Sequence, residues 1–359
     1  MKTNFTLRNA LLAAMIPAVA LLSCSKSDDD NTKDVAQLKK DIISDAATTI
    51  SDSYVDMAAK AQDLSNKVGL LIQTTNQTNL DASKKAWKDM RVTWEETESW
   101  LFGPVESNDI DPRIDTWPVE FNTIDLLLAG NTPLTEEYVN SLDEEEYSLR
   151  GFHPIEYLLW GKDGNKKPTD FTAREKEYLQ ALTANLLKLS NEVKDAWVNG
   201  YATTFKTAGE AGNEEYPSIQ SAYMALVDGM AGICDEVANA KMKDPYEAGD
   251  PKLEESPFAQ NSITDFTNNL EGILKLYQGK FKTDGKGVEE LVRTYNLSLD
   301  NEIKNKHAAA VAALKAINVP FGEAIISKQN LVETAMNRIN DLAETLDAKL
   351  KPFLQQYAK

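Results

Sequence analysis

A histidine and a glutamate stand three residues apart in the segment Gly151-Phe152-His153-Pro154-Ile155-Glu156, and His153 is one of only two histidines in the chain. Imidazole nitrogens and carboxylate oxygens are both ligands for iron, manganese and zinc. Proline is favoured at the first position of a helix, so we predict that Pro154 opens a helix with His153 at its N-cap. Glu156 then lies near the same helix start, where both side chains could meet one cation, or an anion held by free backbone N–H groups.

A purely structural role also fits this spacing. A glutamate at the third position of a helix can accept a hydrogen bond from the N-cap N–H, and Glu156 would then complete a capping box and bind nothing. A lone His-x-x-Glu is a weak signal, so both interpretations stay open. They differ in one geometric respect, because a binding site needs carboxylates from separate helices within about 5 Å of His153, a range over which charges couple strongly.

Two charged residues share a stripe with two tryptophans on a helix predicted for residues 81–102. The stripe steps by four, three and four residues through Trp87, Arg91, Trp94 and Glu98. On an apolar stripe, Arg91 and Glu98 form either a buried ion pair or the wall of a polar pocket between helices. Glu95 and Glu96 lie off this stripe, and we expect them to be solvated.

Two segments that contain proline add acidic candidates. The order of residues in Asp115-Thr116-Trp117-Pro118 is typical of a helix start, where Asp115 or Thr116 caps the first N–H groups. Residues 243–258 hold three prolines and an acidic bias, and they do not resemble a helix. An irregular segment of this length within a compact domain is either disordered or functional.

A polar stripe also accompanies the apolar face of a helix predicted for residues 262–278. Its members are Asp265, Asn269 and Gly272, which either let a neighbouring helix approach closely or line a polar cleft. The second histidine, His307, is flanked by lysines that oppose metal binding, so we expect it at the surface. His153 is therefore the one credible imidazole ligand, which excludes haem held by two histidines and leaves one axial histidine open.

The N-terminus has the features of a bacterial lipoprotein. The apolar run over residues 10–22 is too short to span a bilayer, and it ends in the lipobox Leu21-Leu22-Ser23-Cys24. We predict a signal peptide over residues 1–23, lipidation of Cys24, and an acidic tether over residues 24–33. The protein would then be anchored in the cell envelope through its lipid alone, and we expect the outer membrane, on its periplasmic or its outer side.

The formal net charge of −18 limits the partners of the chain. Negative charge repels nucleic acid and anionic lipid surfaces, so we expect no nucleic-acid binding. It attracts cations weakly and without selectivity, so acidity alone does not indicate a metal site. Lipidation of Cys24 would leave Cys234 without a disulfide partner, and the apolar residues at helical spacing around Cys234 predict a buried, inert thiol.

Helical periodicity recurs along the chain and alternating strand patterns are nearly absent, so we predict an all-α fold with no substantial β-sheet. The expected helices cover residues 35–72, 81–102, 119–129, 135–148, 154–159, 172–200, 216–240, 262–278, 286–317 and 331–352. The polar segment 162–170 is the best candidate for a linker. It divides the chain into an N-terminal helical domain over residues 34–165 and a C-terminal helical-bundle domain over residues 166–359.

The chain resembles the imelysin-like family of bacterial envelope proteins, whose hallmark is Gly-x-His-x-x-Glu. Gly151, His153 and Glu156 match this motif without a gap. Further matching blocks cover most of the chain after the signal and follow the order of the family; they are residues 87–104 (WKDMRVTWEETESWLFGP), 114–118 (IDTWP) and 255–279. The irregular segment 243–258 ends in one of these blocks, so we interpret it as functional.

The resemblance implies an iron-uptake-associated binding lipoprotein of two helical domains, with the functional residues near the junction of the domains. His153 and Glu156 would hold a metal ion, iron first and zinc second, or an iron chelate. An envelope transport protein would be the partner. Our hypothesis completes the site with residues from the matching blocks and the stripe, namely Gly151, Arg91, Glu98, Asp115, Glu255 and Ser256.

Imelysin-like proteins are often labelled metallopeptidases, and the sequence argues against that label. The zincin motif needs a glutamate directly after the first histidine and a second histidine four residues on, but Pro154 and Tyr157 occupy those places. The chain has no Gly-x-Ser-x-Gly elbow, and no Glu-x-x-His pair of the ferritin-like di-iron type. We favour binding over catalysis, with a metallopeptidase and a helical lipoprotein that binds a partner or polymer without metal as the alternatives.

Overall fold

The structure is a computed structural model that describes the backbone of residues 27–359, and the side chains from residue 34 onward except at 144, 145 and 147. Within this part of the chain every regular element is helical, apart from one isolated bridge between Lys280 and Asp284. The prediction of an all-α fold is confirmed. The predicted signal peptide and Cys24 lie outside the described residues.

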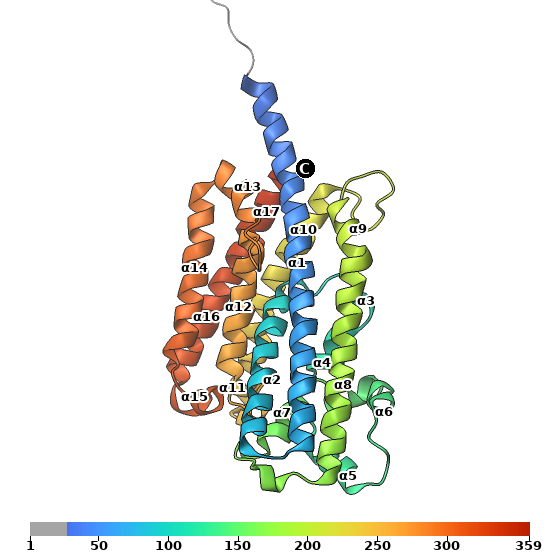
Figure 1. Cartoon of the computed structure of the whole chain (residues 1–359). Coiled ribbons are helices and arrows are strands. Elements are labelled where there is room, and N and C mark those ends of the chain that lie inside the picture. Colours follow the sequence, from blue (N-terminus) through green and yellow to red (C-terminus); the bar gives the residue numbers. More distant parts are fainter. Residues whose placement is uncertain (1–26) are drawn as a thin grey trace, which may run out of the picture.

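Long helices that run along the molecule form its framework (Figure 1). Helix α1 (Ser27–Gln73) packs against α2 (Gln77–Thr97) and α8 (Ala173–Ala196). Helix α2 also packs against α12 (Ser262–Gln278), which contacts α14 (Leu297–Ala316). These contacts place α2 between helices from distant parts of the sequence.

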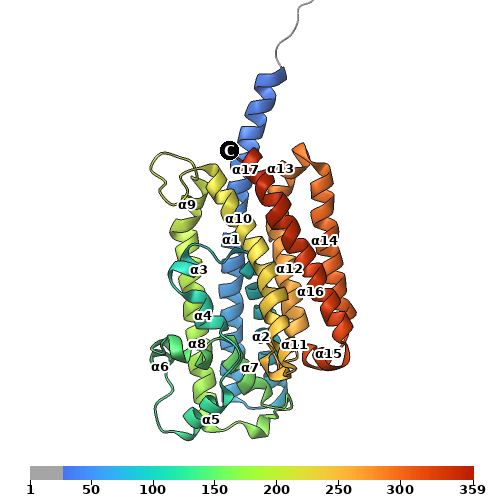
Figure 2. The same ribbon diagram turned by 180° about the vertical axis from the view of Figure 1, so that it is seen from behind.

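The far side of the molecule is covered by α10 (Ile219–Glu236) and α16 (Gln329–Thr345), which pack against each other (Figure 2). A π-helical turn extends α10 through Val237–Lys241, and another extends α16 through Leu346–Leu350 into α17 (Lys351–Tyr357). Each such turn carries a helix beyond its α-helical end.

Short helices connect the framework. Between α2 and α8 they are a 3-10 turn (Glu98–Trp100), α3 (Pro104–Ser107), α4 (Ile110–Asp115), α5 (Phe121–Ala129), α6 (Glu136–Asn140), a 3-10 turn (Glu144–Leu149), α7 (Phe152–Trp160) and a 3-10 turn (Pro168–Asp170). After α8 they are a π turn (Trp197–Tyr201), α9 (Ala202–Lys206), α11 (Lys243–Ala248), a 3-10 turn (Pro251–Leu253), α13 (Val288–Tyr295) and α15 (Phe321–Ser327).

Local signals explain where the long helices begin. Asn76 caps α2 by accepting a hydrogen bond from the backbone of Asn79, and Thr172 and Glu175 form the capping box that opens α8. Three expectations were wrong in detail. The predicted helix 135–148 is α6 followed by a separate 3-10 turn. The segment 243–258 contains α11 and a 3-10 turn, and the predicted helix 286–317 is two helices that meet at Asn296.

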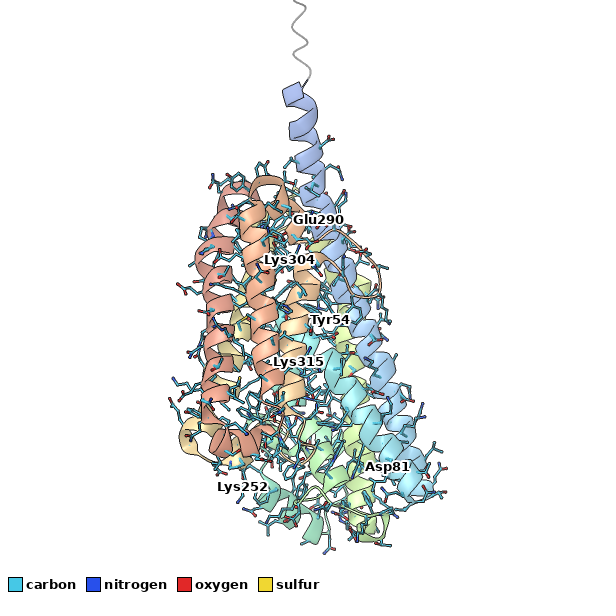
Figure 3. All side chains as sticks on the ribbon, turned by 90° about the vertical axis from the view of Figure 1, so that its left-hand side faces the viewer. Tyr54, Asp81, Lys252, Glu290, Lys304 and Lys315 are labelled. Atoms are coloured by element: carbon cyan, nitrogen blue, oxygen red, sulfur yellow. The ribbon has the colours of Figure 1, made fainter. Side chains whose placement is uncertain are left out.

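Apolar side chains from all the long helices meet in one continuous core. Trp87, Trp94, Trp100 and Trp197 are fully buried in it. Figure 3 shows Tyr54 of α1 among the interior side chains, while Asp81, Lys252 and Lys315 are exposed. The core therefore joins helices from both sides of the predicted boundary at residue 165, and the division into two domains stays a prediction.

The C-terminus lies beside α1 (Figure 1). The side chain of Lys39 on α1 donates a hydrogen bond of 2.9 Å to the main-chain oxygen of Lys359. None of the single helices described has the length and hydropathy to cross a bilayer; α14 and α15 satisfy both criteria only as a pair bent by 84°.

Candidate functional site

The motif glycine lets helix α7 begin directly on the end of α4. Gly151 has φ = 85°, and a Cβ atom at this position would lie 2.2 Å from the carbonyl oxygen of Ile114. A side chain is excluded there by the backbone conformation and by the contact. Gly151 is the N-cap, so the prediction that His153 caps this helix is wrong: His153 is the second helical residue.

His153 is buried, and its two ring nitrogens face carboxylates. Nε2 lies 3.1 Å from Oδ1 of Asp115 on α4, and Nδ1 lies 3.5 Å from Oε2 of Glu156. Asp115 therefore meets the condition of a carboxylate from a separate helix within about 5 Å of the imidazole. Burial lowers the pKa of His153, but the neighbouring carboxylates of Asp115 and Glu156 outweigh burial and raise the pKa to about 9.

Glu156 does not cap its own helix. Its Oε1 accepts a hydrogen bond of 2.7 Å from the backbone N–H of Ala259, more than a hundred residues further along the chain. The capping-box interpretation is therefore wrong, because a capping glutamate occupies the third helical position, which is Pro154, and Glu156 is the fifth residue of α7. Glu156 instead fixes the loop that follows Ser256 against the start of α7.

Arg91 on α2 connects four acidic residues from three other segments and its own helix. Its guanidinium pairs with Asp115 and Glu95, and lies 3.0 Å from Glu255 and 3.6 Å from Asp265. It also lies 4.9 Å from the ring centre of Phe152, which gives a cation–π contact. Arg91 does not pair with Glu98, although the two residues share the predicted stripe.

Lys241, which was not predicted as a site residue, is the partner of Glu98. Its Nζ is 2.8 and 3.0 Å from the two oxygens of Glu98, 2.7 Å from Oε1 of Glu255 and 3.6 Å from Oε2 of Glu95. The predicted helix 216–240 ended one residue too early. The sequence does contain a pattern that indicates burial of Lys241, because this residue follows Val237 by four positions and continues the apolar face of α10.

The expectation that Glu95 and Glu96 are solvated is wrong. Glu95 is fully buried and accepts a hydrogen bond of 2.8 Å from Asn269 of α12, and Glu96 pairs with Lys275 of the same helix. The close approach of α12 explains both, since a Cβ on Gly272 would lie 2.2 Å from the carbonyl oxygen of Glu96. The polar stripe of α12 therefore has two roles. Gly272 lets α2 approach closely, and Asn269 donates a hydrogen bond to Glu95 of α2.

Four carboxylates gather at the centre of this network, and we call them the carboxylate cluster: Glu95, Glu98, Asp115 and Glu255. Each supplies an oxygen within 4.8 Å of an oxygen of every other member. All four are buried, and Oε2 of Glu255 has no hydrogen-bond partner. They come from α2, the 3-10 turn after it, α4 and the loop before α12, so only the folded chain brings them together.

The cluster carries strongly perturbed acidities. Burial raises the pKa of Glu95 well above its usual range and that of Glu98 to about 8. Burial also acts on Asp115, but Arg91 and His153 outweigh it and hold its pKa below the usual range. Glu95 and Glu98 therefore bind protons near neutral pH, while Asp115 stays ionised.

A family model described as imelysin (peptidase M75) matches residues 50–348. This chain belongs to the imelysin family. A relative, iron-regulated protein A of Synechococcus elongatus, is 28% identical over 313 residues, which are 84% of this chain and 83% of the relative.

Two solved structures have the same fold. A putative iron-regulated protein A precursor from Parabacteroides distasonis aligns with a TM-score of 0.81 at 22% identity, over 90% of this chain and 95% of the other. An imelysin-like protein from Psychrobacter arcticum aligns with a TM-score of 0.72 at 14% identity, over 89% and 96%. The prediction of an imelysin-like helical fold is confirmed.

The structure also shows the positions of two further predicted site residues, Ser256 and Asp115. Ser256 is buried and donates a hydrogen bond of 2.7 Å to Asp265, so it supports a neighbour of the carboxylate cluster. Asp115 is the last residue of α4 and caps no following helix, contrary to the capping interpretation. It accepts hydrogen bonds from Arg91 and from the indole of Trp94 instead, the latter at 2.5 Å.

His307 and Cys234 lie away from the carboxylate cluster. His307 is 5% exposed and its Nε2 lies 2.8 Å from the carbonyl oxygen of Leu270, so the expectation of a surface histidine is wrong. The neighbouring lysines point elsewhere because α14 packs its His307 side against α12. Cys234 is buried and free, and burial raises the pKa of its thiol, so the prediction of a buried thiol is confirmed.

The site is closed to solvent, and a surface cavity lies next to the loop that Glu156 holds. The cavity has a volume of about 380 Å³ and is lined by residues that include Phe121, Glu254 and Phe258. His153 and the carboxylate cluster do not line it. An ion that reaches the carboxylate cluster must therefore pass side chains that cover it in this structure.

Proposed function

We propose that this imelysin binds a metal ion, iron first and zinc second, or a metal chelate, at the buried site formed by the carboxylate cluster, His153 and Glu156. We propose further that it takes part in iron uptake. The convergence of four carboxylates from distant segments beside the motif histidine is the observation that carries this proposal. Carboxylate oxygens with one imidazole nitrogen suit iron, manganese and zinc.

The charge of the network fits a bound cation. It contains six carboxyl groups (Glu95, Glu98, Asp115, Glu156, Glu255 and Asp265) and three basic groups (Arg91, Lys241 and His153), all of them buried. The unpaired Oε2 of Glu255 gives one acceptor that no protein donor satisfies. Buried charges without compensation are costly, and a metal ion supplies positive charge without adding protons.

The residues have separate tasks in this proposal. The carboxylate cluster would supply oxygen ligands, and His153 would supply nitrogen after losing its proton, since only the neutral ring binds metal. Arg91 holds Asp115 and Glu255 in position whether or not an ion is present. Gly151 keeps α7 in contact with α4, and so keeps His153 beside Asp115.

We also propose that the protein is attached to the cell envelope. The predicted signal peptide and lipidation at Cys24 would attach the protein to the envelope, and the predicted acidic tether includes residues that continue into α1. A transport protein of the envelope would receive the metal or chelate. The name of the relative from Synechococcus elongatus, iron-regulated protein A, supports an iron-related role for this one.

Metal analysis of paired histidine variants tests the proposal. We expect wild-type protein incubated with Fe²⁺ or Zn²⁺ and then desalted to retain the ion, and His153→Ala to bind it at least about tenfold more weakly. His307→Ala is the matched control, because it removes a buried imidazole outside the site and should lose stability but keep the metal. Equal and negligible metal in all three proteins would contradict the proposal.

A further inference from the structure

A cation of the protein itself already occupies the carboxylate cluster. Nζ of Lys241 lies between 2.7 and 3.6 Å from oxygens of Glu98, Glu255 and Glu95, and the residue is fully buried. Three of the four members of the carboxylate cluster therefore face one ammonium group. Its position is the one from which a single ion could contact those same oxygens.

We infer that Lys241 determines the affinity and selectivity of the carboxylate cluster for metal ions, because its ammonium must leave the oxygens that an entering ion takes. This inference rests on the proposed function. It adds that the chain itself contains a competitor for the metal ion. This competitor, Lys241, lies outside the Gly-x-His-x-x-Glu motif.

The dimensions of the carboxylate cluster favour such an exchange. Its oxygens lie within 4.8 Å of one another, and opposite oxygens around an ion with bonds of about 2.2 Å are about 4.4 Å apart. A small contraction therefore converts the ammonium site into a metal site. The free Oε2 of Glu255 supplies a ligand that Lys241 leaves unused.

The backbone at Lys241 is suited to movement of its side chain. Lys241 is the last residue of the π turn Val237–Lys241, in which the N–H of Met242 donates to the carbonyl oxygen of Val237 at 3.0 Å. Single π turns within α-helices occur frequently at functional sites. The four-carbon side chain of lysine also allows its ammonium to withdraw without displacement of α10.

Selectivity follows from the same competition. An ion that leaves Lys241 in place gains only the free oxygen of Glu255, so weakly coordinating monovalent ions gain little. A divalent ion gains the oxygens of several carboxylates and carries twice the charge of the ammonium. Ions of high carboxylate affinity, such as Fe²⁺, Mn²⁺ and Zn²⁺, are thus favoured over K⁺.

Replacement of the lysine by an uncharged residue of similar length tests the inference. We expect Lys241→Met to bind Mn²⁺ and Zn²⁺ about tenfold or more tightly than wild type, measured by competition with a metal-binding dye, because the competitor is gone. Either ion should also raise the Tm of Lys241→Met by more than that of wild type. Lys275→Met is the control, since Lys275 pairs with Glu96 outside the carboxylate cluster, and its metal affinity should equal that of wild type.

Each alternative result decides a separate point. Unchanged or weaker metal binding by Lys241→Met beside wild-type protein that binds metal overturns the inference alone. Failure of both proteins to bind iron, manganese or zinc overturns the proposed function as well. If Lys241→Met unfolds without metal, Mn²⁺ or Zn²⁺ should restore its helical circular dichroism and cooperative melting, and a chain that stays unfolded with both ions overturns the inference.

Discussion

The chemistry of His153 depends on two carboxylates that belong to different segments. Asp115 and Glu156 hold the ring from both sides and keep it protonated near neutral pH. In the metal-free protein the imidazole is therefore a cation within an acidic network. In the proposed function it would become a ligand only when another cation takes over that role, which would make metal binding dependent on pH.

The raised pKa of His153 predicts how stability changes with pH. The pKa rises from 6.5 to about 9 on folding, so the stabilising contribution is complete below pH 6.5 and is lost as the pH rises through 9. Glu98 acts in the same direction, because its pKa of about 8 lies above its usual value. We expect the metal-free protein to lose roughly 3 kcal/mol between pH 6 and pH 9.5 through His153.

Urea unfolding at pH 6, 7.5 and 9.5, with metal removed, measures this loss. His153→Gln is the comparison, because glutamine cannot titrate and the variant should have a shallower pH dependence than wild type. Identical pH profiles for the two proteins would show that the imidazole is not charged in the folded state.

Some residues of the site could be predicted from the sequence, and others could not, for a physical reason. Arg91, Glu98, Asp115 and Glu255 were selected and lie in one network. Glu95 and Lys241 were not, because a one-dimensional stripe marks one buried face of a helix. Helix α2 is covered on several faces, by α1, α7 and α12, so residues off the stripe are also buried.

At the scale of elements, two glycines allow helices to close on the segment that bears the cluster. A Cβ on Gly272 of α12 would lie 2.2 Å from the carbonyl oxygen of Glu96, and a Cβ on Gly229 of α10 would lie 2.4 Å from that of Ser99. The end of α2 is thus held between α12 and α10 at backbone contact. This contact delivers Asn269 to Glu95 and Glu98.

A methyl group at Gly272 should force α12 away from α2. We expect Gly272→Ala to destabilise the protein by about 3 kcal/mol, since backbone atoms cannot yield as a flexible side chain would. The mid-helix Gly232 of α10 is the control, because it is exposed and no atom lies within 4 Å of its added Cβ. Gly232→Ala should stabilise by about 0.5 kcal/mol.

Guanidinium unfolding of both variants provides the comparison. A loss in Gly272→Ala no larger than the change in Gly232→Ala would contradict the close approach of the two helices. Metal binding should weaken in Gly272→Ala as well, because Asn269 moves with α12.

The long helices were predictable, while the elements between α2 and α8 were less so. Periodic apolar residues over many turns specify α1, α2, α8 and α12, and their capping residues fix where they begin. Helices α3 and α4 are too short to show a period and were not predicted, whereas α5 lies within the predicted helix 119–129. Helix α4 nevertheless supplies Asp115 to the site. The position of α4 depends on its contact with Gly151 and on the pairing of Asp115 with Arg91.

At the scale of the whole molecule, negative charge is distributed over a surface that surrounds a buried network. The chain carries 56 acidic and 38 basic residues, so surface charges repel one another on average. Salt screens exposed charges within about 10 Å at 0.1 M and acts much less on buried ones. Surface repulsion and the buried network therefore respond differently to ionic strength.

Moderate salt should stabilise this protein. We expect the free energy of unfolding to increase by on the order of 1 kcal/mol between 0.02 and 0.3 M KCl, because repulsion is screened while the buried pairs are not. Urea titrations at constant pH, repeated with choline chloride, measure the effect and separate screening from specific binding of K⁺. A decrease with both salts would mean that exposed ion pairs such as Lys286–Asp41 outweigh the repulsion.

The hydrogen bond between Lys39 and Lys359 has a practical consequence for experiments on orientation. Because the last residue of the chain lies beside α1, a protein captured on a sensor chip by a C-terminal tag would face the solution in nearly the same way as one captured through the beginning of α1. The cavity bordered by Phe121 and Phe258 would remain accessible to dissolved ligands in either format. Coupling through the C-terminus would thus substitute for the proposed lipid tether when the proposed transfer of metal to another protein is assayed.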